Sequence, residues 1–227
     1  MIGRRLERFA PAHDKSDSDK GHWLTGWRFI RDVRTVRLVV TLDVLMGVAS
    51  AVWIAAIMLP FVVEELGAGE RWWGYINAAY MLGSIAGSVL LLSFANRMNS
   101  QLPRWIVVGM LGAGGVTLCF GSSTHPLLAL FFSFVLGPLY QMLLISKQTV
   151  LQQAAATDRL PYVMSAKGAI DSAVFGFSAL AMGGIAEWLG TRTAYFLSAG
   201  FLCFAAVFAW RLRQPSAAPP LKVEQME

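Results

Sequence analysis

The sequence has few charged residues: 15% of its 227 residues are Asp, Glu, Lys or Arg. Soluble domains carry about 25% charged and about 45–50% apolar residues, whereas this chain is 56% hydrophobic. A soluble fold would leave too much of that apolar surface in water. This composition therefore excludes an ordinary soluble domain and indicates a membrane protein.

Histidine and cysteine are scarce, with three and two residues respectively. His13, His22 and His125 lie outside the long apolar runs, and no His, Cys, Asp or Glu cluster has metal-ligand spacing. We expect no metal site and no cofactor. Cys119 and Cys203 fall in different apolar runs at different expected depths, so we interpret them as small packing residues and not as a disulfide.

The partners needed for intramembrane catalysis are also missing. Ser178, in "GFSAL", is the one serine in a suggestive setting, but no apolar run contains a histidine that could act as its base. A paired-aspartate protease needs two aspartates in the membrane. Asp43 and Asp171 supply that number, yet neither carries a recognisable catalytic motif. We therefore do not expect an enzyme.

Long apolar runs are what the sequence does contain. Several approach or exceed the ~18 residues that mark a transmembrane helix, and prolines or loop residues separate them. The runs predict six spans, at 38–63, 72–95, 105–121, 126–146, 163–188 and 194–210. The expected fold is an all-α membrane protein with a transmembrane domain over 38–211.

The positions of lysine and arginine predict the orientation. Of the 19 basic residues, all but Arg71 and Arg192 lie on one side of the predicted spans. Because cytoplasmic loops retain positive charge, we expect a multi-pass cell-membrane protein with both termini in the cytoplasm and with residues 64–71, 122–125 and 189–193 outside. The net charge of +5 follows from this asymmetry and from anionic lipid, so no nucleic-acid partner is expected.

The two terminal segments are predicted to be cytoplasmic. Residues 1–37 lack the apolar core of a secretory signal. Within them Trp23, Trp27, Ile30 and Arg34 have helical spacing, which fits a short basic helix at the headgroup level, although a plain linker explains the aromatic residues equally well. Residues 212–227 have little apolar surface to pack and are expected to be disordered.

Small residues gather in two of the spans. The second contains "GSIAGS", and the fifth contains Gly168, Ser172, Gly176, Ser178, Gly183 and Gly184. Small residues at four-residue spacing let helices approach closely, which is often static packing. Here they fill the second and fifth spans, whereas the third and sixth carry no charge. A fold of repeated three-helix units would show this pattern.

Three stretches carry a resemblance to a known family: "GWRFIRDVRTVRLVV", "WWGYINAAYMLGSIAGSVLLLSFANRM" and "KQTVLQQAAATDRLPYVMSAKGAIDS". In pattern and order, residues 22 to 212 resemble the C-terminal half of a major facilitator superfamily transporter, in the branch of macrolide-efflux and enterobactin-exporter proteins. The resemblance implies twelve spans in two six-helix halves around a central cavity, each half made of two inverted three-helix repeats. This chain would supply one half, and 1–37 would resemble the linker between halves.

Two loops depart from that family. Its members often carry an Asp-Arg-x-Gly-Arg-type loop after the second span, where this chain has Asn96, Arg97, Met98 and Asn99. The missing carboxylate puts an ionic lock at this loop in doubt. The loop before the fifth span commonly ends in an Arg-Gly-Arg run, which is replaced here by "LPYV".

The resemblance also assigns candidate roles. It implies that the first and fourth spans line the cavity, the second and fifth face the other half, and the third and sixth are outer supports. The candidate cavity residues are then Asp43, Trp53 and Gln141, and the candidate gating or coupling residues are Asn77, Tyr80, Lys167 and Asp171. Hydrogen bonding between helices is an alternative role for Asn77 and Gln141, and contact with lipid is an alternative for Trp53.

Lys167 and Asp171 are opposite charges on one helical face inside an apolar run. An unpaired charge at the membrane centre costs about 2.5–3.5 kcal/mol, so such residues usually face a partner or water. We interpret the pair as a proton-sensitive gate in which protonation of Asp171 releases Lys167. A static ion pair, extended by Asp43 at a similar depth, is the alternative.

The sequence thus predicts a half-unit of a transporter for proton-coupled efflux of a small amphipathic solute, such as a drug or siderophore. Its expected partners are the bilayer and either a second six-helix half or a second copy of the chain. The alternative is a non-transporting six-span protein, either the relic of a split gene or a regulatory partner of another membrane protein.

Overall fold

Helices make up the architecture of the chain, for which a computed structural model describes residues 19–93, 101–155 and 159–210. The elements are α1 (Asp19–Asp32), α2 (Arg34–Ser50), η2 (Ala51–Trp53), α3 (Ala55–Pro60), η3 (Phe61–Glu65), α4 (Arg71–Ser93), α6 (Leu102–Gly121), α7 (Pro126–Ala154), α8 (Leu160–Leu189) and α9 (Thr191–Trp210). Six helical stretches, Arg34–Trp53 and the helices α4, α6, α7, α8 and α9, are long and apolar enough to cross a membrane. The predicted all-α fold with six spans is confirmed.

Prolines begin three of these helices, as the sequence suggested. Pro103, Pro126 and Pro161 each occupy one of the first two positions of α6, α7 and α8. A proline is well suited there because its fixed φ is helical and its missing N–H would have no helical partner. The end of α7 differs from the prediction: the helix continues to Ala154 instead of stopping at 146, because "KQTVLQQA" contains no glycine or proline to break it.

The predicted first span, 38–63, is not one continuous helix. Ile54 is extended (φ −73°, ψ 154°) between η2 and α3, and a π turn, η3, directly follows Pro60, which has no N–H to continue the α-helical ladder. Hydroxyl groups of α9 stabilise the break. Ser198 Oγ donates to the carbonyl of Ala49 at 2.5 Å, and Tyr195 Oη donates to the carbonyl of Val52 at 3.2 Å.

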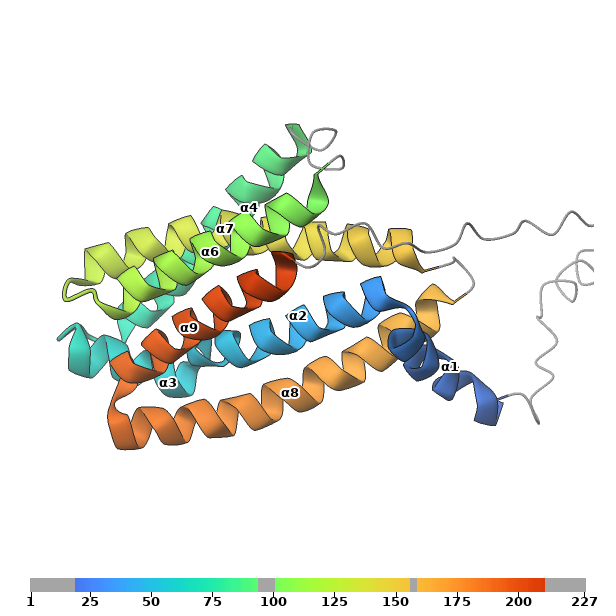
Figure 1. The fold of residues 1–227 in the computed structure, drawn as a ribbon. Coiled ribbons are helices and arrows are strands. Elements are labelled where there is room, and N and C mark those ends of the chain that lie inside the picture. Colours follow the sequence, from blue (N-terminus) through green and yellow to red (C-terminus); the bar gives the residue numbers. More distant parts are fainter. Residues whose placement is uncertain (1–18, 94–100, 156–158, 211–227) are drawn as a thin grey trace, which may run out of the picture.

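The six spans pack with unequal coverage (Figure 1). The helix α6 lies between α7 and α9, α4 runs along α7, and α2 packs against α9 and α8. Half of the α6 span is buried, against 22% of α4 and 11% of α8. The second and fifth spans therefore have the largest open faces, which is where the family resemblance places a second half.

Glycines allow α4 and α7 to pack very closely. A Cβ atom at Gly83 would lie 2.0 Å from the Phe134 carbonyl oxygen, and one at Gly137 would lie 2.4 Å from the Ser84 backbone nitrogen. The small residues of the second span are thus used within this chain. The glycines of α8 differ, since a Cβ atom would meet nothing within 4 Å at Gly168, Gly176, Gly183 or Gly184, although Ser178 of the same helix is buried.

The three segments predicted to lie on the external side of the membrane meet at one end of the bundle. Arg192 Nε lies 2.5 Å from Glu65 Oε2, and Arg192 Nη2 donates to the Ser123 carbonyl at 3.4 Å. One side chain thus joins the start of α9 to the end of η3 and to the connection between α6 and α7. This arrangement fits the predicted alternation of the spans, while the side of the membrane on which this end lies stays a prediction.

At the opposite end, α1 crosses the start of α8 (Figure 1). The contact is close, because a Cβ atom at Gly26 would lie 2.2 Å from the Tyr162 carbonyl oxygen. Within α1, Ile30 is buried, whereas Trp27 is 42% exposed. The segment is therefore a packed helix, and its place at the headgroup level stays a prediction. Asn96, Arg97 and the tail 212–227 lie outside the described residues.

Candidate functional site

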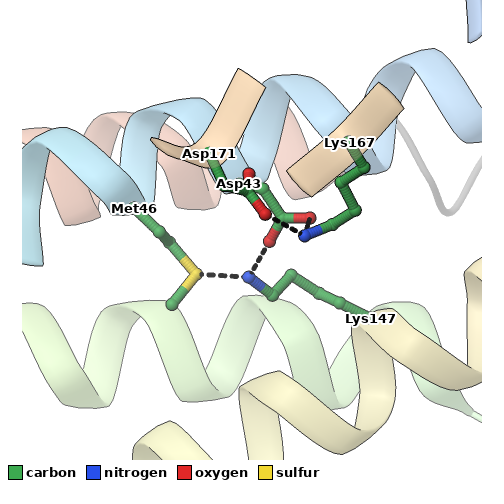
Figure 2. Close-up of polar contacts among 5 residues, drawn as sticks. All are labelled: Asp43, Met46, Lys147, Lys167 and Asp171. Carbon is green, nitrogen blue, oxygen red and sulfur yellow. Dashed lines mark hydrogen bonds and ion pairs between the residues drawn. The ribbon is translucent and has the colours of Figure 1, made fainter. Parts of the chain in front are cut away.

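A network of four charged side chains joins the three helices α2, α7 and α8 (Figure 2). Asp43 of α2 is at its centre. Lys147 of α7 donates to Asp43 Oδ1, while Lys167 Nζ of α8 lies 3.1 Å from Asp43 Oδ2 and 2.5 Å from Asp171 Oδ2. The predicted Lys167–Asp171 pair is present, and Asp43 extends it as the static alternative proposed. Asp43 also connects it to a fourth residue.

Burial differs across the network. The side chains of Lys147 and Asp43 are 7% and 10% exposed, that of Lys167 is 20% exposed and that of Asp171 is 39% exposed. Buried charges are tolerated only when they are paired, and here two ammonium groups face two carboxylates. The Asp43–Lys147 pair forms the buried part, whereas Asp171 is the member most open to the surroundings of α8.

Lys147 is a functional candidate that the sequence analysis missed. The predicted fourth span stopped at 146, so Lys147 was counted among the charges flanking the membrane. In the structure α7 continues, and Lys147 lies inside the bundle, with its Nζ 3.0 Å from Met46 Sδ as well as paired with Asp43. The absence of any helix breaker between 147 and 154 was the available signal.

A cavity of about 120 Å³ reaches the network. Asp43, Lys147 and Lys167 line it together with apolar residues of α2, α7 and α8. A single water molecule needs only about 10–15 Å³, when the volume is measured as the space open to the centre of a water-sized sphere. The cavity is therefore large enough for several waters beside charged groups that can hydrogen-bond to them, which is what proton movement to these groups requires.

A second cavity, of about 170 Å³, lies beside the break in the first span. It brings together three predicted candidates, Trp53, Asn77 and Tyr80, and adds Tyr140, which was not predicted. Ten residues of α-helix, the separation of Asp43 and Trp53, would span roughly 15 Å. The aromatic cavity and the charged network are therefore two separate sites that share the first span.

Two polar groups at this aromatic cavity are buried without a hydrogen-bond partner among the described residues. These are Trp53 Nε1 and Tyr140 Oη, which lie near each other without forming a hydrogen bond of normal geometry. Trp53 does not fit the lipid-facing alternative, because its ring lies 4.7 Å from that of Phe120 and 5.4 Å from that of Tyr195. The cavity thus offers aromatic walls and two polar groups able to bond a ligand.

Gln141 lines neither cavity. Its Nε2 donates to Ser88 Oγ at 2.7 Å, and Ser88 Oγ donates to the Ser84 carbonyl at 2.9 Å. These bonds tie α7 to α4, which is the interhelical role considered as the alternative. Asn77 donates to the Trp73 carbonyl within its own helix at 2.9 Å and to Met58 Sδ of α3 at 3.9 Å, so it also bonds between helices while it lies on the cavity wall.

The described part of the chain contains no group of three or more His, Cys, Asp or Glu side chains placed to hold a metal ion. Cys119 and Cys203 are free thiols. The polar groups that line the two cavities are ammonium, carboxylate, phenol, indole, amide, hydroxyl and thioether groups.

Comparison with known proteins places these features in a family context. Residues 14–226 match the family described as Major Facilitator Superfamily. The uncharacterized MFS-type transporter YfmI of Bacillus subtilis (strain 168) is 33% identical over 179 residues, which cover 79% of this chain and 44% of YfmI. The uncharacterized MFS-type transporter YjbB of the same organism is 31% identical over 189 residues, which cover 83% of this chain and 46% of YjbB.

The chain spans about half the length of the curated relatives it matches. No solved structure matches it.

Proposed function

The chain belongs to the major facilitator superfamily, and from this membership we propose that it forms one six-helix half of a proton-coupled exporter. The proposed cargo is a small amphipathic solute such as a drug or siderophore, a class supported by the resemblance to macrolide-efflux and enterobactin-exporter proteins. The other half of the transport path comes from a second six-helix unit or from a second copy of this chain. Alternating access then moves the solute outward.

The observation that carries this proposal is the shared position of Lys167 between two carboxylates. Its ammonium lies 2.5 Å from Asp171 and 3.1 Å from Asp43. A proton arriving on Asp171, the most exposed member, removes one partner without leaving Lys167 unpaired. The ammonium then turns toward Asp43, which strengthens the connection between α8 and α2. Protonation thus changes how α8 is held, while Lys167 keeps one carboxylate partner.

The aromatic cavity supports a solute that is both apolar and polar. Trp53, Tyr80 and Tyr140 supply apolar surface, and the two unpaired polar groups supply orientation. Its volume of about 170 Å³ is below the ~300–1,000 Å³ of typical ligand sites. The cavity therefore serves as one wall of a larger site that a second half completes.

The alternative is a six-span protein that does not transport. It is less well supported, because the family match extends over residues 14–226 and both curated relatives are MFS-type transporters. The open faces of α4 and α8 also fit a chain that pairs with another unit.

Transport by the Asp171→Asn variant tests the proposal. The chain is expressed either together with a candidate second six-helix half or by itself as a dimer, and proton-driven accumulation of ethidium is followed in inverted membrane vesicles. We expect D171N to keep normal expression and membrane insertion and to lose proton-coupled transport. The exposed Glu70→Gln variant is the matched control and keeps transport. The wild-type chain alone, as a strict monomer, does not transport.

The opposite results are equally clear. Full proton-coupled transport by D171N removes Asp171 from the mechanism. Loss of membrane insertion in D171N but not in E70Q supports a static ion pair, and ethidium transport by the isolated monomer contradicts the half-unit assignment.

A further inference from the structure

A third pocket, of about 500 Å³, lies between α1 and the start of α8, apart from both cavities described above. It plays no part in the proposed transport cycle. The residues that define its chemistry are Thr25, Arg28, Phe29, Asp32, Arg159 and Tyr162. Two guanidinium groups, one carboxylate, two hydroxyl groups and two aromatic rings thus surround one space.

Close contacts between α1 and α8 build this pocket. The helices approach at Gly26, where a Cβ atom would collide with the carbonyl of Tyr162. The Arg159 guanidinium lies 5.9 Å from the centre of the Phe29 ring, a cation–π distance. These contacts hold the two arginine-bearing segments at a fixed spacing, so the pocket is more than a group of independent surface charges.

The pocket carries unbalanced positive charge. Among the side chains that the structure describes, neither Arg28 nor Arg159 has a carboxylate partner, and Asp32 pairs instead with Arg31 at 3.6 Å. Guanidinium groups bind phosphate through planar, paired hydrogen bonds. The chemistry that fits this space is therefore an anionic phosphate group.

The place of the pocket in the fold identifies the source of that phosphate. The membrane-spanning helices α2 and α8 begin at Arg34 and Leu160, directly beside it. The exposed Trp27 on α1 has the character of residues found at membrane interfaces. Arginines next to a span commonly bind anionic lipid headgroups. We propose that Arg28 and Arg159 together bind the phosphate of an anionic phospholipid and thereby fasten α1 to the membrane surface.

Lipid retention by the purified full chain tests this site. The chain is placed in nanodiscs of equimolar phosphatidylcholine and phosphatidylglycerol, and the lipids that stay bound are counted by native mass spectrometry. We expect the wild type to retain phosphatidylglycerol in preference. In the double variant R28Q/R159Q, the ratio of retained phosphatidylglycerol to phosphatidylcholine should fall about tenfold, because two charge-assisted contacts are removed.

A matched double variant separates a site from general surface charge. R34Q/R104Q removes the same charge from exposed positions outside the pocket and leaves the Arg31–Asp32 pair intact, so we expect it to keep the preference. R28Q alone leaves the Arg159–Phe29 contact intact, so its partial loss of preference shows that the effect does not come from unfolding of α1.

Three results overturn the proposal. The first is no preference for phosphatidylglycerol in the wild type, and the second is an equal loss in both double variants. In the third, millimolar inorganic phosphate raises the thermal stability of the chain in neutral detergent as much as phosphatidylglycerol does, which would make this a site for soluble phosphates.

Discussion

Asp43 holds the charged network together, because its two carboxylate oxygens face two different lysines. In the Asp43→Asn variant, the amide oxygen at 43 can still accept a hydrogen bond, but Lys147 loses its carboxylate partner and becomes an uncompensated buried charge. We expect D43N to lower the free energy of unfolding by about 3–5 kcal/mol. The measurement is denaturation of the purified chain by sodium dodecyl sulfate, followed by tryptophan fluorescence.

Two further variants make this prediction specific. D171N should cost about 1 kcal/mol or less, because Asp171 is partly exposed and Lys167 retains Asp43. The double variant D43N/K147M removes both buried charges and should recover at least half of the loss, since apolar groups often replace a buried ion pair without cost. Equal losses in D43N and D171N would contradict the assigned burial.

Two tyrosines offer a matched pair for testing the aromatic cavity. Tyr140 Oη lies near Trp53 but forms no hydrogen bond of normal geometry with a described residue, whereas Tyr195 Oη donates to the Val52 carbonyl at 3.2 Å. Y140F should therefore leave the free energy of unfolding unchanged or slightly higher and raise the KM for transported solute several-fold. Y195F should cost about 0.5–1.5 kcal/mol of stability. An unchanged KM in Y140F would remove its hydroxyl from solute binding.

At the residue scale, the sequence predicted individual ion pairs better than it predicted the whole charged network. Lys167 and Asp171 could be paired from their spacing on one helix, and Asp43 could be added from its expected depth. Lys147 could not be added, because its position depends on how far α7 continues. Tyr140 could not be predicted as a cavity residue for another reason. An aromatic residue in an apolar run has no distinguishing sequence pattern, and the role of Tyr140 follows from the neighbouring Trp53.

At the scale of the helices, Gly137 of α7 lies against a neighbouring helix, whereas Gly176 of α8 does not. In Gly137→Ala, the new methyl group meets the backbone of α4, so we expect a loss of about 1–3 kcal/mol in the unfolding free energy of the chain. In Gly176→Ala it meets nothing within 4 Å, and alanine stabilises a helix interior by about 0.5–1 kcal/mol relative to glycine.

Chemical denaturation of both variants at the same chain concentration checks this. An equal loss in G176A would mean that α8 is already packed against another copy under the conditions of the measurement.

The break in the first span shows where element prediction stops. A hydropathy pattern reports that residues 38–63 are apolar, and apart from Asp43 no residue of that span is charged. The extended residue Ile54 carries no local signal, since neither glycine nor proline is adjacent to it. The break is stabilised by Ser198 and Tyr195, which are far away in sequence, so no local pattern could have located it.

For the whole molecule, the unequal distribution of basic residues predicts the orientation. In a background with both native cysteines replaced by alanine, an Ala68→Cys variant should react with an impermeant thiol reagent from outside the cell. An Asp17→Cys variant should react only after the membrane is opened. Reaction at position 17 but not at 68 in intact cells would reverse the predicted topology.

The number and order of the spans could be predicted because bilayer thickness sets the length of an apolar helix. Their packing could be predicted only in part. The sequence assigned the small residues of both the second and the fifth spans to interfaces, but it could not show that Gly83 faces α7 of this chain while Gly176 faces open space. Which neighbour a small residue meets depends on the arrangement of all six helices.

The balance of two lysines and two aspartates in the network has an electrical consequence. With all four groups ionised, the cluster carries no net charge, so the voltage across the membrane exerts no net force on it. One added proton gives it a charge of +1, and each elementary charge moved through 100 mV is worth about 2.3 kcal/mol. A single proton thus turns an electrically silent group of helices into one that the membrane potential can drive.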